Sequence, residues 1–176
     1  MINFTLYASN TLGNLSNVLY PRKILVTDEA SMLDAIKYDH VSAKFKNNYR
    51  SSANFIKADN LVLDCDNDHS DDPNEWVDVE DVANTFQDIP FIAAYSRNNM
   101  KQKGSKSPRP RFHVYFMIAE VTDSNKYAEI KQKIAGAFPY FDTNALDSAR
   151  FIFGTSSPQI EIYDGNKSIE DFLASL

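Results

Sequence analysis

The chain has 176 residues, the size of one domain, and 43% of them are hydrophobic, which is enough apolar material to bury a core and excludes an intrinsically disordered class. One cysteine excludes a disulfide framework and a multi-cysteine zinc site, and the five glycines form neither a Walker A loop nor a dinucleotide-binding fingerprint. The net charge of −6 argues against a nucleic-acid partner only if the charge is evenly spread, which it is not.

Strands and helices alternate along the chain. Strands are predicted where short apolar runs occur, at residues 24–26, 61–66, 90–95, 112–118, 149–153 and 160–163. Helices are predicted by caps or by apolar residues spaced three or four apart, at residues 28–36, 75–86, 125–138 and 168–176. This alternation predicts the fold class α/β (α+β), as a single compact domain over residues 1–176 in which mixed central sheets are flanked by helices.

The predicted strand at residues 61–66, LVLDCD, ends in two carboxylates. Because side chains alternate across a strand, Asp64 and Asp66 leave it on the same face, about 7 Å apart, where both can reach one hard cation. Cys65 points to the opposite face, between carboxylates that raise its pKa, and is predicted to be a core thiol rather than a nucleophile. The alternative is that both aspartates only cap the next turn.

The same stretch partly fits a calcium-loop pattern. Its oxygen-bearing residues fall on ligand positions 1, 3, 5, 7, 9 and 12, as Asp64, Asp66, Asp68, Ser70, Asp72 and Glu75. However, His69 stands where the sharp turn requires glycine, and a strand rather than a helix precedes the loop. A calcium loop is therefore the weaker of the two metal hypotheses.

Charge is divided between two blocks. Residues 64–81, the acidic segment, hold nine carboxylates and no lysine or arginine, whereas residues 101–111, the basic segment, hold five cations and no carboxylate. Crowded carboxylates repel one another unless a cation relieves them, although solvated charged loops are the ordinary interpretation of such runs. The basic segment lies in a loop long and polar enough to be a mobile arm, and we expect Lys101, Lys103 and Lys106 to contact a nucleic-acid backbone.

The stretch RPRFHVYFMI, residues 109–118, begins in the basic segment and continues as a predicted strand. It carries Arg109, Arg111 and His113 at alternating positions. Alternation places these three side chains on one face, with apolar residues behind them. Two guanidinium groups and an imidazole form an array of donors suited to phosphate oxygens. The alternatives are a salt-bridged surface strand and, for His113, a satisfied core histidine.

A third acid lies in the segment at residues 138–154. Asp142 or Asp147 could complete a three-carboxylate site with the first two acids, or either could cap the local turn instead. Arg150 follows at the start of the next predicted strand. The residues alone leave the choice between the two acids open.

In their order along the chain, these three elements resemble the catalytic domain of the archaeo-eukaryotic primase superfamily, in particular the primase-polymerases of plasmids, phages and integrative elements. Residues 61–66 are similar to its first motif, an apolar strand ending in Asp-x-Asp/Glu, and residues 111–113 to its second, which ends in His. Residues 141–142 followed by Arg150 are similar to its third. The chain departs from the pattern in having arginine where many relatives have serine in the second motif, and Asp147 is another choice for the third.

The resemblance implies an RRM-like catalytic core and template-directed nucleotidyl transfer, the reaction of a DNA primase or primase-polymerase. Two Mg²⁺ or Mn²⁺ ions would then be held by three carboxylates, Asp64, Asp66 and Asp142. Residues around the second and third motifs would bind the incoming nucleotide, namely Arg109, Arg111, His113 and Arg150. Arg150 could instead support the carboxylates.

The partners implied are a single-stranded DNA template with its primer, nucleoside triphosphates and a replicative helicase. No stretch approaches the roughly 20 apolar residues of a membrane span, and the first ten residues lack the regions of a signal peptide, so we expect a cytoplasmic protein of a bacterium, phage or plasmid with no membrane partner. Two other classes stay open. One is a metal-dependent nuclease or phosphoesterase, because two-metal acid sites also cleave phosphodiesters, and the other is a non-catalytic nucleic-acid-binding replication module.

Overall fold

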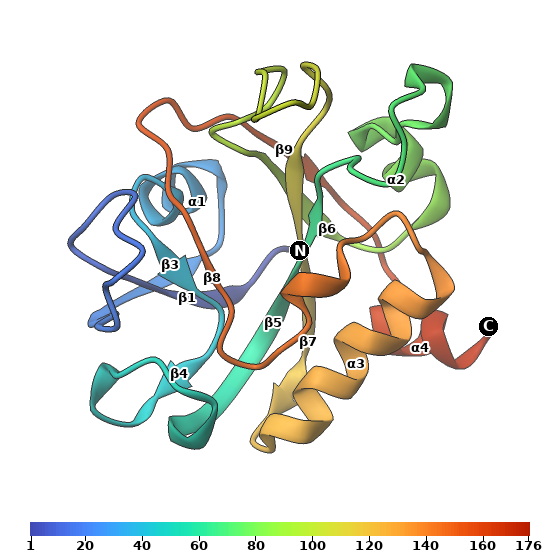
Figure 1. The fold of residues 1–176 in the computed structure, drawn as a ribbon. Helices are drawn as coiled ribbons and strands as arrows, with labels where there is room; N and C mark the ends of the chain where they lie inside the picture. The colour runs from blue at the N-terminus through green and yellow to red at the C-terminus, as the bar shows by residue number, and fades with distance from the viewer.

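The computed structural model describes residues 1–176, apart from the side chain of Ala145. Its strands form two sheets (Figure 1). The larger sheet has the order β4-β5-β7-β6-β9, with bounds Lys44–Phe45, Phe55–Cys65, Phe112–Val121, Phe91–Tyr95 and Ile160–Tyr163. The smaller sheet has the order β2-β1-β3-β8, with bounds Arg22–Val26, Phe4–Ala8, His40–Val41 and Phe151–Ile152.

Every strand pair in the two sheets is antiparallel, so the predicted mixed sheets are wrong. The cause is the connection from β5 through α2 (Val79–Thr85) to β6, which runs these two strands in the same direction without pairing them. β7 lies between them and runs opposite to both. The predicted RRM-like core is matched only in the order β5-β7-β6, because β9 pairs with β6 instead of lying beside β5.

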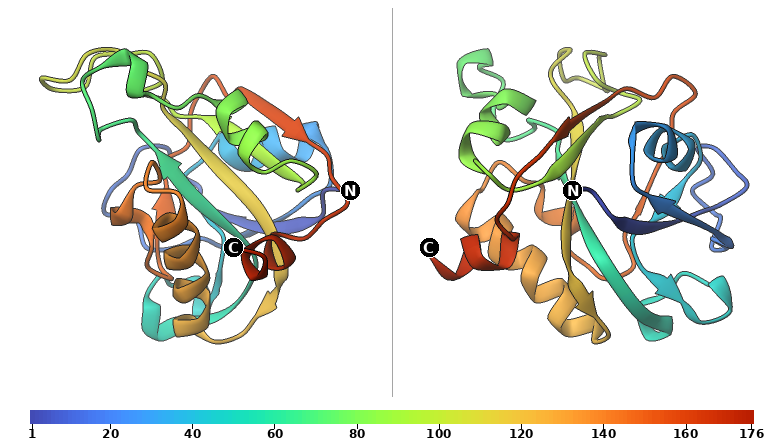
Figure 2. Two further views of the ribbon diagram at one scale, coloured as in Figure 1. Left: turned by 90° about the vertical axis from the view of Figure 1, so that its right-hand side faces the viewer. Right: turned by 180° about the vertical axis from the view of Figure 1, so that it is seen from behind.

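The larger sheet lies at the centre of the molecule, with helices on one face and the smaller sheet on the other (Figures 1 and 2). Three helices cover the first face with a continuous apolar core: α2, α3 (Ser124–Ala137) and α4 (Ile169–Ala174). The smaller sheet and α1 (Glu29–Ile36) pack against the second face, where Val62 and Tyr115 are buried. Burial of each large apolar side chain contributes about 2 kcal/mol, so both faces of this sheet are held.

This layering decides where the end of β5 directs its side chains. Leu61, Leu63 and Cys65 face the helices, whereas Val62 belongs to the core beneath the smaller sheet and Asp64 lies on that same side. Cys65 has no exposed surface, and burial raises the pKa of its thiol to about 12, in agreement with the predicted core thiol. Asp64 is therefore aimed at the space between the two sheets.

Most predicted elements are present with shifted ends. Asp28 caps α1 as expected. The helix predicted over residues 75–86 begins only at Val79, because Asp78 is its N-cap and Pro73–Glu75 form a separate 3-10 turn. The prediction missed β1 and the two-residue strands β3 and β4. Among the helices that the structure describes, none has the length and apolar composition needed to cross a membrane.

Candidate active site

A cleft of about 220 Å³ opens where the end of β5 meets the start of β7 and strand β8. Its ionisable lining residues come from separate segments of the chain and are Asp64, Asp66, Arg97, Lys103, His113 and Arg150. The structure thus brings together the two carboxylates, the histidine and the third-motif arginine that the sequence singles out. It also adds Arg97, which the sequence analysis did not single out, and Lys103, which it assigned to a nucleic-acid contact.

Asp64 is the buried centre of this cleft. It is paired across the sheet with His113, whose Nε2 lies 2.6 Å from Asp64 Oδ1, and Arg150 Nη2 lies 3.5 Å from Asp64 Oδ2. His113 thus lies against Asp64 Oδ1 and Arg150 beside Asp64 Oδ2, so both oxygens of this buried carboxylate face a cationic group. A cation that binds Asp64 would therefore have to displace one of these two partners.

The charges of the cleft favour an ionised Asp64–His113 pair. Burial by itself would raise the pKa of Asp64, but the neighbouring His113 and Arg150 outweigh it, and the pKa is lowered. Burial would likewise lower the pKa of His113, but the Asp64 carboxylate outweighs it, and that pKa is raised. Both shifts favour a carboxylate beside an imidazolium, an arrangement that can exchange its partners for a cation and for a phosphate.

Asp66 faces the same cleft but is paired with the basic segment. Its Oδ2 lies 3.2 Å from Lys103 Nζ and 3.7 Å from Arg111 Nη1. Lys106 Nζ lies 3.6 Å from a carboxylate oxygen of Asp68. The acidic and basic segments thus neutralise each other, which corrects their interpretation as two separately solvated loops. Of the three lysines predicted to contact nucleic acid, Lys103 and Lys106 are turned toward carboxylates.

The prediction that Arg109 and Arg111 share a strand face with His113 and offer it to phosphate is wrong for this structure. β7 begins at residue 112, both guanidinium groups are fully buried, and neither belongs to the described lining of the cleft. Arg109 donates to the carbonyl groups of Asn67 and Ser70, and Arg111 Nη1 donates to Asp68 Oδ1 at 3.0 Å. A buried cation needs such partners, and the acidic segment supplies them, so both arginines hold that segment in place.

The two choices for a third acid lie differently. The Asp142 N–H donates to the Asp64 carbonyl at 2.8 Å, and Asp142 lines a neighbouring hollow that also includes Asp66. Its carboxylate accepts the Asn144 N–H, as a turn cap does. Asp147 is exposed and accepts the Ala149 N–H. Asp142 is therefore the acid whose main chain adjoins Asp64, although its carboxylate is turned to a local cap.

The calcium-loop alternative is wrong. Asp72 caps the 3-10 turn at residues 73–75, and a strand precedes the loop. In the part of the chain whose side chains are described, no group of three His, Cys, Asp or Glu residues is arranged to hold a metal ion. The strand-end carboxylates thus stand as a pair with oxygen ligands directed into the cleft, not as a closed cation cage.

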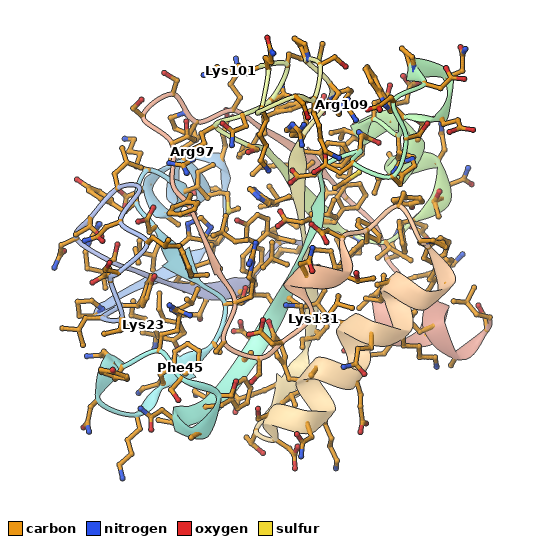
Figure 3. All side chains as sticks on the ribbon, viewed as in Figure 1. Lys23, Phe45, Arg97, Lys101, Arg109 and Lys131 are labelled. Carbon is orange, nitrogen blue, oxygen red and sulfur yellow. The ribbon has the colours of Figure 1, made fainter. Side chains whose placement is uncertain are left out.

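Two buried polar groups behind the cleft were missed by the sequence analysis. Lys131 on α3 donates to the Asp147 carbonyl at 3.2 Å, and burial lowers its pKa to about 8 (Figure 3). The sequence feature that could have indicated a buried Lys131 is its position four residues after Tyr127, on the apolar face of the predicted helix. His40 Nε2 lies 2.6 Å from the hydroxyl of Tyr115, two residues after His113 on β7. These contacts brace the loop before Arg150 and the strand that carries His113.

No family model and no curated protein matches the sequence. Among solved structures, the AEP domain of the cyanophage S-2L primase-polymerase matches with a TM-score of 0.54 and 14% sequence identity, over 98% of this chain and 88% of that one. The chain has an archaeo-eukaryotic primase-like fold. The match covers nearly the whole of this chain, so the likeness concerns the arrangement of both sheets and their helices.

Proposed function

We propose that the protein is a nucleotidyltransferase, a DNA primase or primase-polymerase that joins nucleoside triphosphates on a single-stranded DNA template. The observation that carries the proposal is the meeting of Asp64 and Asp66 with His113 and Arg150 in one cleft. A carboxylate pair facing cationic donors suits a triphosphate bound with divalent cations. The primase-like fold supports the same assignment.

The residues of the cleft fit Mg²⁺ or Mn²⁺ as the cofactor. Asp64 and Asp66 supply the hard oxygen ligands that these ions prefer, and both carboxylates line the cleft. Asp142 is proposed as the third ligand from the resemblance: its main chain is hydrogen-bonded to that of Asp64, and its carboxylate, which caps a local turn in this structure, would have to turn toward the cleft. When bound, such ions lower the pKa of the attacking hydroxyl and neutralise the triphosphate.

The chain's own residues then have distinct tasks. His113 and Arg150, which contact Asp64 in this structure, hold the phosphates of the incoming nucleotide. The 3′-oxygen of the primer attacks the α-phosphorus, the bond from that phosphorus to the bridging oxygen breaks, and pyrophosphate leaves while the hydroxyl proton passes to solvent. Arg109 and Arg111 position the carboxylates from behind by holding the acidic segment. A replicative helicase as partner stays a prediction from the resemblance.

The test is primer extension on a labelled template-primer with Mn²⁺ and nucleoside triphosphates. Asp64→Asn and Asp66→Asn keep the side-chain volume and each remove one anionic ligand, so each should lower the rate at least about 100-fold. Asp164→Asn is the matched control, because Asp164 is an exposed acid that lies 3.9 Å from the N-terminal amine, and this variant should extend the primer normally. Extension by either cleft variant at the control rate would refute the ligand assignment, and shortening of the primer would indicate a nuclease.

A further inference from the structure

A strip of guanidinium groups and aromatic rings runs along the wall of the cleft, whose lining includes Arg97, Phe151 and Phe153 as well as the carboxylates. We call Arg50, Phe151, Phe153 and Arg97 the cation–aromatic strip. The Arg50 guanidinium lies 4.7 Å from the centre of the Phe151 ring, and the Arg97 guanidinium lies 4.0 Å from the centre of the Phe153 ring. The two rings meet edge to face at 5.0 Å. Because Arg150 precedes Phe151 directly and reaches Asp64, the strip begins at the carboxylates.

Exposed apolar side chains frame the strip. Leu15, Leu19 and Tyr49 are 71%, 51% and 46% exposed, and Leu15 also lines the cleft. Leu19 and Tyr49 come from two loops that pair with each other, next to the N–H of Arg50. Exposed apolar side chains close to such a strip are typical of a surface that binds a partner.

The charge distribution defines the partner. Four stretches, residues 1–27, 40–58, 89–119 and 148–160, contain 13 of the 18 basic residues and none of the 24 acidic ones. All four members of the strip and their apolar frame lie in these stretches. In space, Lys103, Lys106 and Arg111 are paired with acidic residues, whereas Arg50 and Arg97 have no carboxylate partner among the described side chains, which favours an anionic partner for the strip over a neutral ligand.

We propose that the cation–aromatic strip binds single-stranded nucleic acid along the wall of the cleft, beside its carboxylates. Aromatic rings offer stacking faces to unpaired bases, and guanidinium groups pair with phosphates or stack on bases in turn. A duplex hides its base faces, so the rings of the strip select the single strand. That the bound strand is the template rests on the proposed function, whereas the binding itself does not.

The test measures anisotropy of a labelled oligothymidylate of about 15 nucleotides, with EDTA present and no triphosphate. The double variant Arg97→Gln/Phe153→Leu should bind about tenfold more weakly and show a salt slope smaller by about 0.7, because one phosphate contact and one stacking face are lost. The control is Lys126→Gln/Lys133→Gln, which neutralises two exposed lysines of α3 on the helix layer, and its affinity should stay within about twofold of wild type.

A second variant separates binding from folding. Tyr49→Ser removes a ring that is 46% exposed, so its melting temperature should match wild type while its affinity falls severalfold. Equal affinities for the strip variants and the lysine control, or equally effective competition by a duplex, would overturn the inference. If the strip variants bind the oligonucleotide more weakly but wild type does not extend a primer, this inference stands and the proposed enzyme activity is refuted. If wild type extends a primer but the strip variants bind as wild type does, the enzyme activity stands and this inference is refuted.

Discussion

Replacement of Lys103 by glutamine should strengthen the binding of a divalent cation to the cleft. Lys103 Nζ lies 3.2 Å from Asp66 Oδ2, and their side chains are 46% and 18% exposed. At this distance the attraction in water is about 1 kcal/mol, in the upper range for exposed ion pairs. A cation that takes Asp66 as a ligand must replace this contact, so Lys103→Gln should lower the dissociation constant for Mn²⁺ about fivefold.

The assay follows the paramagnetic resonance signal of free Mn²⁺ during titration at low salt, without nucleotide. Lys101→Gln is the matched control, because Lys101 is exposed in the same basic segment and has no ion pair within the described part of the chain. The gain should shrink at high salt, where exposed charges are screened. Unchanged or weaker Mn²⁺ binding by Lys103→Gln, relative to Lys101→Gln, would refute the view that this lysine competes for a metal-ligating carboxylate.

Three further predictions concern the scaffold of the cleft. Burial lowers the pKa of His40 to about 4, so between pH 4 and 6.5 the His40 side chain takes up a proton in the unfolded chain but not in the folded one. The free energy of unfolding of wild type, measured in urea, should therefore fall by about 2 kcal/mol from pH 7.5 to pH 5. His40→Gln should lack this loss. Arg109→Met should cost about 3 kcal/mol in urea unfolding, because it strips buried carbonyl groups of the acidic segment of their donor; a cost below about 1 kcal/mol would contradict this. Gly154→Ala should lower the free energy of unfolding by about 3 kcal/mol, because the new Cβ would lie 2.5 Å from the Tyr38 backbone. Gly136→Ala in α3 places its Cβ where no atom lies within 4 Å, so it should raise the free energy of unfolding by up to about 1 kcal/mol. Equal melting temperatures of the two variants would contradict both predictions.

The parts of the site that follow local periodicity were predictable. Alternation along LVLDCD separates Asp64 from Cys65, and the two side chains do lie on opposite faces of β5. Alternation also places His113 on a strand, and β5 and β7 pair so that it faces Asp64. Successive side chains of a strand point to opposite faces, and the apolar face must be buried. Together these two conditions fix which side chains of the strand face the cleft.

The parts that depend on long-range pairing were not predictable. The alternation of Arg109 and Arg111 looks like that of a strand, but Pro110 between them cannot donate to a sheet, and both side chains fold into the acidic segment instead. Their partners lie about 40 residues earlier, and no local pattern predicts that contact. The prediction recognised both charge blocks but not that each is the counter-ion of the other.

The cation–aromatic strip shows the same limit more strongly. Its four side chains come from three segments that lie far apart in the chain, and each segment alone is unremarkable in composition. The one signal in the sequence was the absence of carboxylates from the three stretches that hold the strip, residues 40–58, 89–119 and 148–160. Such a signal gains meaning only when the fold shows that those stretches are neighbours in space.

The most direct test of the central claim is the sizing of products made on homopolymer templates with one labelled nucleotide at a time, in the presence of Mn²⁺. The account predicts that wild type lengthens the product only when the nucleotide is complementary to the template, and that Asp64→Asn does not. Incorporation that ignores the template, or products of equal length from wild type and Asp64→Asn, would contradict the claim that this cleft performs template-directed nucleotidyl transfer.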